Sequence, residues 1–174
     1  VEAMSEAPLP RVLCVDDNLH QLEALKVTLK RGFDVTTARS GEEALALIET
    51  AAPFAVIVSD MNMGGMDGAT FLNRARYLSP GTIRVLLTGG ADLQSALDAI
   101  NRGYVFRLLE KPCPATELRE ALDQAVAEYR LSQARTEGLE DLVFRDDLTQ
   151  LYNRRYFELV HPQEHTRCER HGRR

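Results

Sequence analysis

Short apolar runs alternate with helical patterns along most of the chain. Three runs are continuously apolar, which is typical of strands covered by helices on both faces: residues 12–15, 56–58 and 85–87. Two further runs, residues 33–38 and 104–109, mix apolar and polar side chains. We therefore predict five strands, with the two mixed ones toward the edges of the sheet.

Between these runs, apolar residues recur at the three- and four-residue spacing of amphipathic helices. They are Leu22, Leu25 and Leu29; Ala44, Leu47 and Ile48; Leu72, Ala75 and Leu78; Leu93, Ala96, Leu97 and Ile100. Helix starts are indicated by a capping box, Ser40 with Glu43, and by good N-cap residues at Asn18, Asp67 and Asp92, while Gly32 is a stop signal.

Strict alternation of strands and helices predicts an α/β fold with a doubly wound, five-stranded parallel sheet. Three central and two edge strands suit the order 2-1-3-4-5, which is flavodoxin-like, followed by an extended C-terminal helix. In such sheets ligands bind beyond the carboxyl ends of the strands. The functional residues are therefore expected there.

Length and composition narrow the class of protein. The 174 residues suffice for one domain and an appendage, and a net charge of −5 gives no reason to expect a nucleic-acid partner. No apolar run reaches the ~20 residues of a membrane span and no signal peptide is present, so no membrane partner is expected. Cys14 lies in an apolar run and is expected to be buried and reduced, which fits a cytoplasmic protein. Residues 1–9 are interpreted as a tail, of which the first three, ahead of Met4, suit a cloning remnant.

Polar residues follow the predicted central strands. Asp16 and Asp17 end the first strand, Asp60 the third and Thr88 the fourth, and the fifth runs into Lys111. Strands one and three are neighbours in the expected order, so three carboxylates converge on one cleft, where a hard dication such as Mg²⁺ would relieve their repulsion.

A carboxylate beside Mg²⁺ can attack a phosphoryl group and form an acyl phosphate. Thr88 would then donate a hydrogen bond to one phosphoryl oxygen, and Lys111 would neutralise another. Each residue alone has an ordinary alternative, since an Asp pair after a strand is often a turn and Lys-Pro is often solvated. The joint pattern carries the prediction, because every element falls at the same edge of the sheet.

Four segments together resemble the receiver domain of two-component response regulators. They are Val-Leu-Cys-Val-Asp-Asp-Asn at residues 12–18, Asp-Met-Asn-Met-Gly-Gly-Met-Asp-Gly at 60–68, Leu-Leu-Thr-Gly at 86–89 and Glu-Lys-Pro at 110–112. The resemblance covers roughly residues 10–130. It implies a regulatory phosphoacceptor domain rather than an enzyme, with a sensor histidine kinase or a phosphotransfer protein as its partner.

The resemblance also assigns roles to single residues. It implies that Asp60 is the phosphoacceptor, that Asp16 and Asp17 are the acidic pair for Mg²⁺, and that the backbone carbonyl of Asn62 is a further metal ligand. Thr88 and Lys111 match the residues that sense and bind the phosphoryl group.

Two positions depart from the family pattern. Gly64 and Gly65 stand after Met63, where the family usually has proline, so a more mobile loop is expected. The switch aromatic normally lies three residues before the lysine, where this chain has Leu108, with Phe106 two residues earlier. Leucine cannot hydrogen-bond, so rotation of an aromatic toward Thr88 is expected to be weakened or replaced.

A helical pattern continues from Thr116 to Phe144, beyond the length that the fold requires. Its apolar seam follows heptad spacing: Leu118, Leu122, Ala125, Tyr129, Ser132, Thr136, Leu139 and Val143. One interpretation is a parallel coiled coil, with residues 131–144 as a signalling helix that makes a homodimer. The other is a fifth helix packed on its own domain with a frayed extension.

Residues 145–157, Arg-Asp-Asp-Leu-Thr-Gln-Leu-Tyr-Asn-Arg-Arg-Tyr-Phe, resemble the opening of the GGDEF diguanylate cyclase domain. Residues 145–174 are interpreted as its truncated start, without the catalytic signature, so the chain itself is expected to make no cyclic di-GMP. The spacing of four further residues matches no standard zinc site, and we interpret them as an exposed remnant of a truncated helix: His161, His165, Cys168 and His171.

Two other functions fit parts of the pattern. A Mg²⁺-dependent phosphohydrolase of the haloacid dehalogenase type uses a similar sheet, but it places Asp-x-Asp on strand one, whereas Asp16 and Asp17 are adjacent here. A phosphorylation-independent dimerisation scaffold would not need the acidic cluster with Thr88 and Lys111.

Overall fold

The fold of this chain is a parallel five-stranded sheet with the strand order β2-β1-β3-β4-β5. The computed structural model describes residues 8–101 and 104–144. The strands are β1 (Arg11–Val15), β2 (Asp34–Ala38), β3 (Val56–Asp60), β4 (Ile83–Thr88) and β5 (Arg107–Glu110). The predicted fold class and strand order are confirmed, and β2 and β5 are the edge strands.

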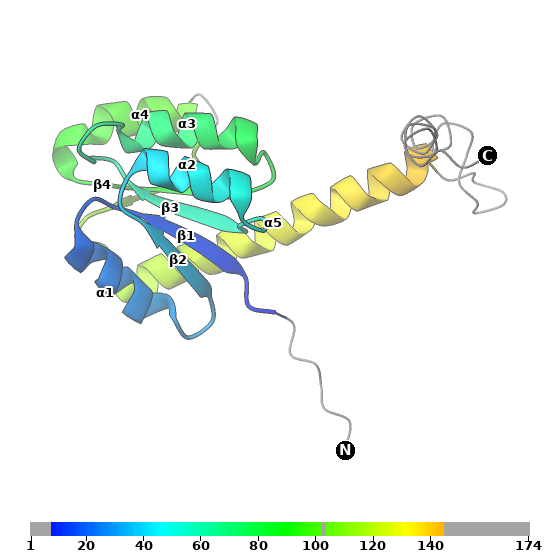
Figure 1. Ribbon diagram of the computed structural model, residues 1–174, viewed down its shortest axis with the longest axis horizontal. Helices are drawn as coiled ribbons and strands as arrows, with labels where there is room; N and C mark the ends of the chain where they lie inside the picture. Colours follow the sequence, from blue (N-terminus) through cyan, green and yellow to red (C-terminus); the bar gives the residue numbers. More distant parts are fainter. Residues whose placement is uncertain (1–7, 102–103, 145–174) are drawn as a thin grey trace, which may run out of the picture. The chain divides into compact units, whose positions relative to one another are not determined.

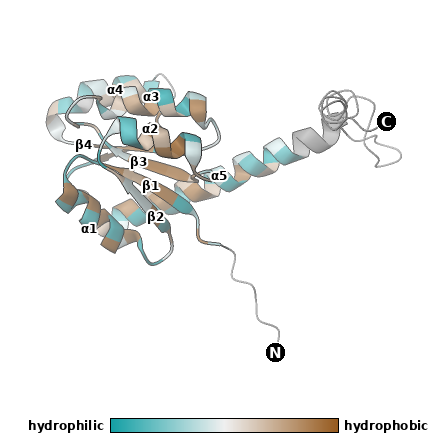
Figure 2. Cartoon of the chain, in the orientation of Figure 1, coloured by the Kyte–Doolittle hydropathy of each residue, from teal (hydrophilic) through white to brown (hydrophobic). Residues whose placement is uncertain are grey.

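Helices cover both faces of the sheet (Figure 1). One face carries α2 (Gly41–Thr50), α3 (Gly68–Leu78) and α4 (Leu93–Asn101), and a 3₁₀ turn, η1 (Gly90–Asp92), precedes α4. The other face carries α1 (Leu19–Leu29) and the first part of α5 (Ala115–Phe144). Because both faces are covered, the central strands are hydrophobic along most of their length (Figure 2).

The helix starts follow the predicted caps. The side chains of Asn18, Ser40 and Asp67 each accept a hydrogen bond from a backbone N–H in the first turn of α1, α2 and α3. The Glu43 carboxylate accepts one from the backbone just before Ser40, at 2.8 Å, so the two residues act reciprocally as a capping box does. These caps place the helix starts at the edge of the sheet where the acidic residues lie.

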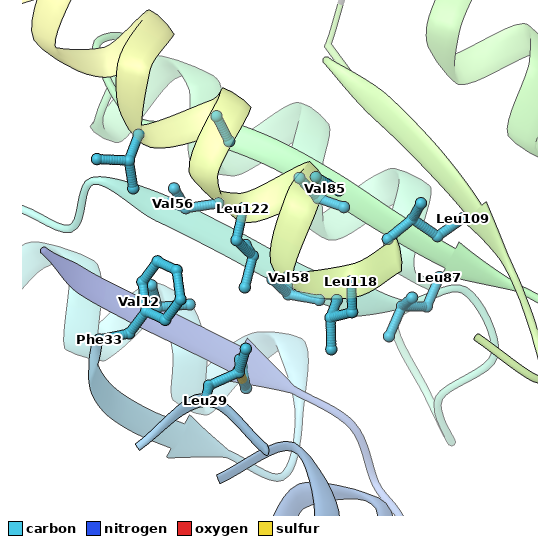
Figure 3. Close-up of a cluster of buried hydrophobic side chains, with 14 of the residues drawn as sticks. Val12, Leu29, Phe33, Val56, Val58, Val85, Leu87, Leu109, Leu118 and Leu122 are labelled. Atoms are coloured by element: carbon cyan, nitrogen blue, oxygen red, sulfur yellow. The ribbon is translucent and has the colours of Figure 1, made fainter. Parts of the chain in front are cut away.

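The packing of α5 against the sheet decides between the two interpretations of its heptad seam. Leu118 and Leu122 point from α5 toward β1, β3 and β4 (Figure 3). Leu118 is 3% exposed, and both Leu122 and Ala125 are 0% exposed. Tyr129 packs against the same cluster. As far as Tyr129, α5 is therefore a core helix of its own domain.

The prediction that Leu118, Leu122 and Ala125 form a dimer seam is consequently wrong for these positions. The three- and four-residue spacing arises because one stripe of α5 faces the sheet. Farther along the helix, the Thr136 hydroxyl donates to the Ser132 carbonyl at 3.0 Å. The side chains of Leu139 and Val143 lie outside the described residues.

A close backbone approach joins β3 to α3. The Gly68 N–H donates to the Met61 carbonyl at 2.8 Å. A Cβ atom at Gly68 would lie 2.1 Å from the Asp60 carbonyl oxygen, so no larger residue fits without a shift of the backbone. Glycine thus allows α3 to begin directly beside the end of β3.

Within the part of the chain that the structure describes, no helix combines the length and the apolar character needed to cross a bilayer.

Candidate functional site

Three carboxylates meet at the carboxyl edge of the sheet. Asp60 is the last residue of β3, and Asp16 and Asp17 follow β1, which pairs directly with β3. One carboxylate oxygen from each lies within 4.8 Å of the other two. Asp16 is 2% exposed and Asp60 7%, whereas Asp17 is exposed. The structure therefore brings together the three acids that the strand order predicted to be neighbours.

Backbone contacts hold the acidic pair in place. The Asp16 N–H donates to the Ala38 carbonyl at 3.2 Å, and Asp16 Oδ1 accepts a hydrogen bond from the Asn18 N–H at 2.9 Å. Asp17 Oδ2 accepts one from the Gly64 N–H at 3.0 Å. These contacts were not predicted, because a strand pattern does not reveal which backbone N–H a carboxylate will face.

Lys111 closes the cluster from β5. Its Nζ lies 2.7 Å from Asp60 Oδ1 and 3.3 Å from Asp16 Oδ2. The Lys111 N–H donates to the Thr88 carbonyl at 2.8 Å, and the peptide bond to Pro112 is cis. Lys111 is thus the cation that neutralises the two most buried acids of the site.

Burial and charge act in opposite directions on this ion pair. Burial raises the pKa of Asp60, against the hydrogen bond and the charge of Lys111, while the nearby Asp16 carboxylate adds to the rise. Burial alone would lower the pKa of Lys111, but the hydrogen bond and charge of Asp60 and the charge of Asp16 raise it overall. Lys111 is therefore held as an ammonium ion, and the ionised form of Asp60 depends on its neighbours.

Thr88 is fully buried at the end of β4, next to the strand that ends in Asp60. Its hydroxyl donates to the Gly89 carbonyl at 3.0 Å. Leu108 lies in β5 and packs, partly buried, against the core under α2, α3 and α4, whereas Phe106 is 45% exposed just before β5. The two positions considered for the switch thus differ in environment, and only Phe106 presents an aromatic ring to solvent.

The loop after β3 forms one rim of the site. Gly65 has a φ of +96°, in the left-handed region, and this backbone conformation favours glycine over other residues at this position. The Asn62 side-chain amide donates to the Asp92 carboxylate across the rim. Asp92 immediately precedes α4 as predicted, but this contact, which no sequence signal indicated, ties the loop to η1.

The donor set fits a hard divalent cation. Three carboxylates converge with oxygen atoms only, and such a set, completed by water and phosphate oxygens, is what Mg²⁺ prefers. His161, His165, Cys168 and His171 lie outside the described residues, as does the segment that resembles the cyclase opening.

Comparison with known proteins identifies the class. The family model described as the response regulator receiver domain matches residues 12–123, more than half of the chain. The chain therefore belongs to the response regulator receiver domain family, and the resemblance inferred from the motifs is confirmed for this part. Membership in a regulatory family leaves the phosphohydrolase alternative without support.

The curated relatives include transcriptional regulators. The hydrogenase transcriptional regulatory protein HoxA of Cupriavidus necator is 33% identical over 115 residues, which cover 66% of this chain and 24% of that protein. The alginate biosynthesis transcriptional regulatory protein AlgB of Pseudomonas aeruginosa is 34% identical over 136 residues, covering 78% and 30%. The chain thus spans less than a third of the length of these relatives.

Solved structures with the same fold belong to proteins with other names. One titled as adenylate cyclase from Rhodopirellula baltica has a TM-score of 0.75 and 41% identity, and covers 76% of this chain and 98% of that one. The signal receiver domain of an HD domain-containing protein from Pseudomonas fluorescens has a TM-score of 0.70 and 32% identity, with 78% and 99% covered. The comparisons therefore agree on the receiver fold, while the names of the proteins that carry it differ.

Proposed function

We propose that Asp60 accepts a phosphoryl group from a phosphohistidine of a sensor kinase or phosphotransfer protein. An Asp60 carboxylate oxygen attacks phosphorus, the phosphorus–nitrogen bond breaks, and the donor histidine leaves and takes up a proton. The observation that carries this proposal is Lys111 Nζ at 2.7 Å from Asp60 Oδ1, at the point where three carboxylates converge.

The surrounding residues have complementary tasks. Asp16, Asp17 and Asp60, with the backbone carbonyl of Asn62, would hold Mg²⁺, which when bound offsets the negative charge of the phosphoryl oxygens. On phosphorylation, the ammonium group of Lys111 would exchange its contact with the Asp60 carboxylate for one with a phosphoryl oxygen. In the proposed phosphorylated state the Thr88 hydroxyl leaves the Gly89 carbonyl and donates to another phosphoryl oxygen.

The experiment is labelling with acetyl phosphate or a phosphorylated histidine kinase in the presence of Mg²⁺. We expect one phosphoryl group per chain, located on Asp60 by mass spectrometry after borohydride trapping. Asp60→Asn should abolish the label, and Asp123→Asn, at an exposed position on α5, should leave it unchanged. Undiminished labelling of Asp60→Asn would overturn the assignment.

We also propose that this switch does not rely on rotation of an aromatic at position 108. Leu108 is partly buried in the core and has no hydrogen-bonding group, so only the backbone of β5 and Lys111 can follow the movement of Thr88 there. Phe106 is too exposed to act as a packed counterpart in the described state. The response to phosphorylation is accordingly carried by Thr88 and Lys111.

For the output we propose a diguanylate cyclase domain that begins near Arg145. Support comes from the Asp-x-Leu-Thr-x-Leu-x-Asn-Arg-Arg run within residues 145–157, and the proposed division is a tail at 1–9, the receiver at 10–130, a signalling helix at 131–144 and the cyclase start at 145–174. The names of HoxA and AlgB favour a DNA-binding output instead. The full-length protein should make cyclic di-GMP from GTP, and its failure to do so would favour the transcriptional alternative.

The proposed setting is the cytoplasm, where a histidine kinase presents its phosphohistidine. We propose that the protein acts as a homodimer through the C-terminal helix beyond Arg130, because the earlier seam positions are already buried in the receiver core. A cyclase that needs two copies face to face would give such a dimer its purpose.

A further inference from the structure

A polar cavity lies between α3 and α4, away from the acidic cluster. Its volume is about 300 Å³, and its hydrogen-bonding lining comes from three elements. Thr70 and Asn73 belong to α3, Ser95 and Asp98 to α4, and Tyr104 precedes β5. The cavity is too large for a single metal ion held by one carboxylate, and it is of a size that a small organic molecule fills.

One wall of this cavity contains an unmet hydrogen-bond acceptor. Asn73 Oδ1 is buried and accepts no hydrogen bond from any residue that the structure describes. A buried acceptor without a donor is costly, and most such atoms in proteins have a partner. The group that would complete this site must therefore bring an N–H or O–H donor.

The facing wall contributes a negative charge. Asp98 is exposed at the cavity, and none of the ion pairs in the described ranges involves it. Two nearby arginines make other contacts, although Arg76 Nε is buried without a hydrogen-bond partner among the described residues. Arg76 stacks over the rings of Tyr77 and Tyr104, and Arg84 donates to the carbonyls of Thr82 and Tyr104. The cavity thus offers an acceptor oxygen and a carboxylate that pairs with no cation in the described part of the chain, and none of the residues that line it is a cation.

We propose that this cavity binds a small organic ammonium ion. An ammonium group has three donors and one positive charge, so it can donate to Asn73 Oδ1 and to the Asp98 carboxylate at once, with a hydroxyl of Ser95 or Thr70 as a further acceptor. Its alkyl part would lie against Ala69 and Ala99, which also line the cavity. The site is separate from Asp60 and does not depend on phosphorylation.

The test is an NMR titration of the whole 174-residue chain with n-propylammonium chloride, against sodium chloride at equal ionic strength. We expect saturable shifts confined to the backbone amides of Thr70, Asn73, Ser95 and Asp98. Asp98→Asn, at an exposed position that should not disturb the fold, should weaken binding by roughly tenfold or more through loss of a charge-assisted hydrogen bond.

Two further variants complete the design. Asn73→Leu should weaken binding by removing the buried acceptor. Glu120→Gln, which neutralises an exposed acid on α5, should bind as the parent does. Shifts that fail to saturate, that spread over the whole surface, or that persist unchanged in Asp98→Asn would overturn the proposal.

Discussion

Replacing Leu122 by alanine tests whether the α5 seam belongs to the receiver core or to a dimer. Leu122 is 0% exposed and packs in the cluster that joins α5 and α1 to the sheet. If that burial is intramolecular, the substitution must destabilise each single chain, whatever the protein concentration. If the seam instead needs a second copy, the loss must depend on concentration, because association follows mass action.

The size of the effect follows from the volume removed. Leucine to alanine deletes three carbon atoms, or roughly 2.4 kcal/mol at about 0.8 kcal/mol per buried methylene. The cavity left in a packed interior adds to this, and buried leucines in general lose about 3–5 kcal/mol on truncation. We expect a loss near 3–4 kcal/mol, a large share of the ~5–15 kcal/mol that holds a domain of this kind together.

The assay is urea unfolding followed by circular dichroism at two protein concentrations that differ tenfold. Leu131→Ala on the same helix is the matched control, since Leu131 is 53% exposed and its truncation should change the unfolding free energy by no more than about 0.5 kcal/mol. A loss below about 1 kcal/mol for Leu122→Ala, or a loss that vanishes at the higher concentration, would refute the burial argument.

Two predictions concern the proposed phosphorylation site. Gly68→Ala should lower the free energy of unfolding by about 1–3 kcal/mol, because the added Cβ would lie 2.1 Å from the Asp60 carbonyl oxygen. Gly89→Ala is the control and should be nearly neutral, because no atom lies within 4 Å of its added Cβ. Equal unfolding free energies for the two variants would contradict the close approach at Gly68. Asp60→Asn should raise the melting temperature at pH 7 in metal-free buffer. Burial raises the pKa of Asp60 above 3.8 in the folded state, so the contribution of Asp60 to folding stability is complete below pH 3.8 and is lost as the pH rises through the folded pKa. The increase in melting temperature caused by Asp60→Asn should therefore become smaller as the pH is lowered toward 3.8. A lower melting temperature for the variant than for the parent at pH 7 would refute this reasoning.

The fold could be predicted from the sequence because its signal is repeated and redundant. Continuous apolar runs identified β1, β3 and β4, and alternation with helices left few arrangements for the sheet. Convergence of the acids followed from the same reasoning, because the carboxyl ends of parallel strands share one edge. The sequence alone therefore predicts that Asp16, Asp17 and Asp60 lie together, as they do in the structure.

What the sequence could not supply is the direction of a side chain and the partner of a helix face. A three- and four-residue stripe suits a helix on a sheet as well as a coiled coil, so Leu118 and Leu122 allowed both interpretations until their burial was seen. The contact of Asn62 with Asp92 and that of Asp17 with the Gly64 N–H join loops far apart in the chain, and no periodic pattern encodes them.

The position of Lys111 links the chemistry to the rest of the receiver. The same side chain that contacts Asp60 follows β5 directly, and α5 begins at Ala115, four residues later. Phosphorylation would replace the single negative charge of Asp60, which faces Lys111, by nearly two negative charges on the phosphoryl group. These charges would lie farther from the backbone of Asp60 by the length of the acyl phosphate. Arg107 of β5 donates to Gln124 of α5, so a shift of β5 would act on a helix whose inner face is packed in the core. We therefore propose that the charge change at Asp60 reaches α5 through Lys111 and the contact of Arg107 with Gln124.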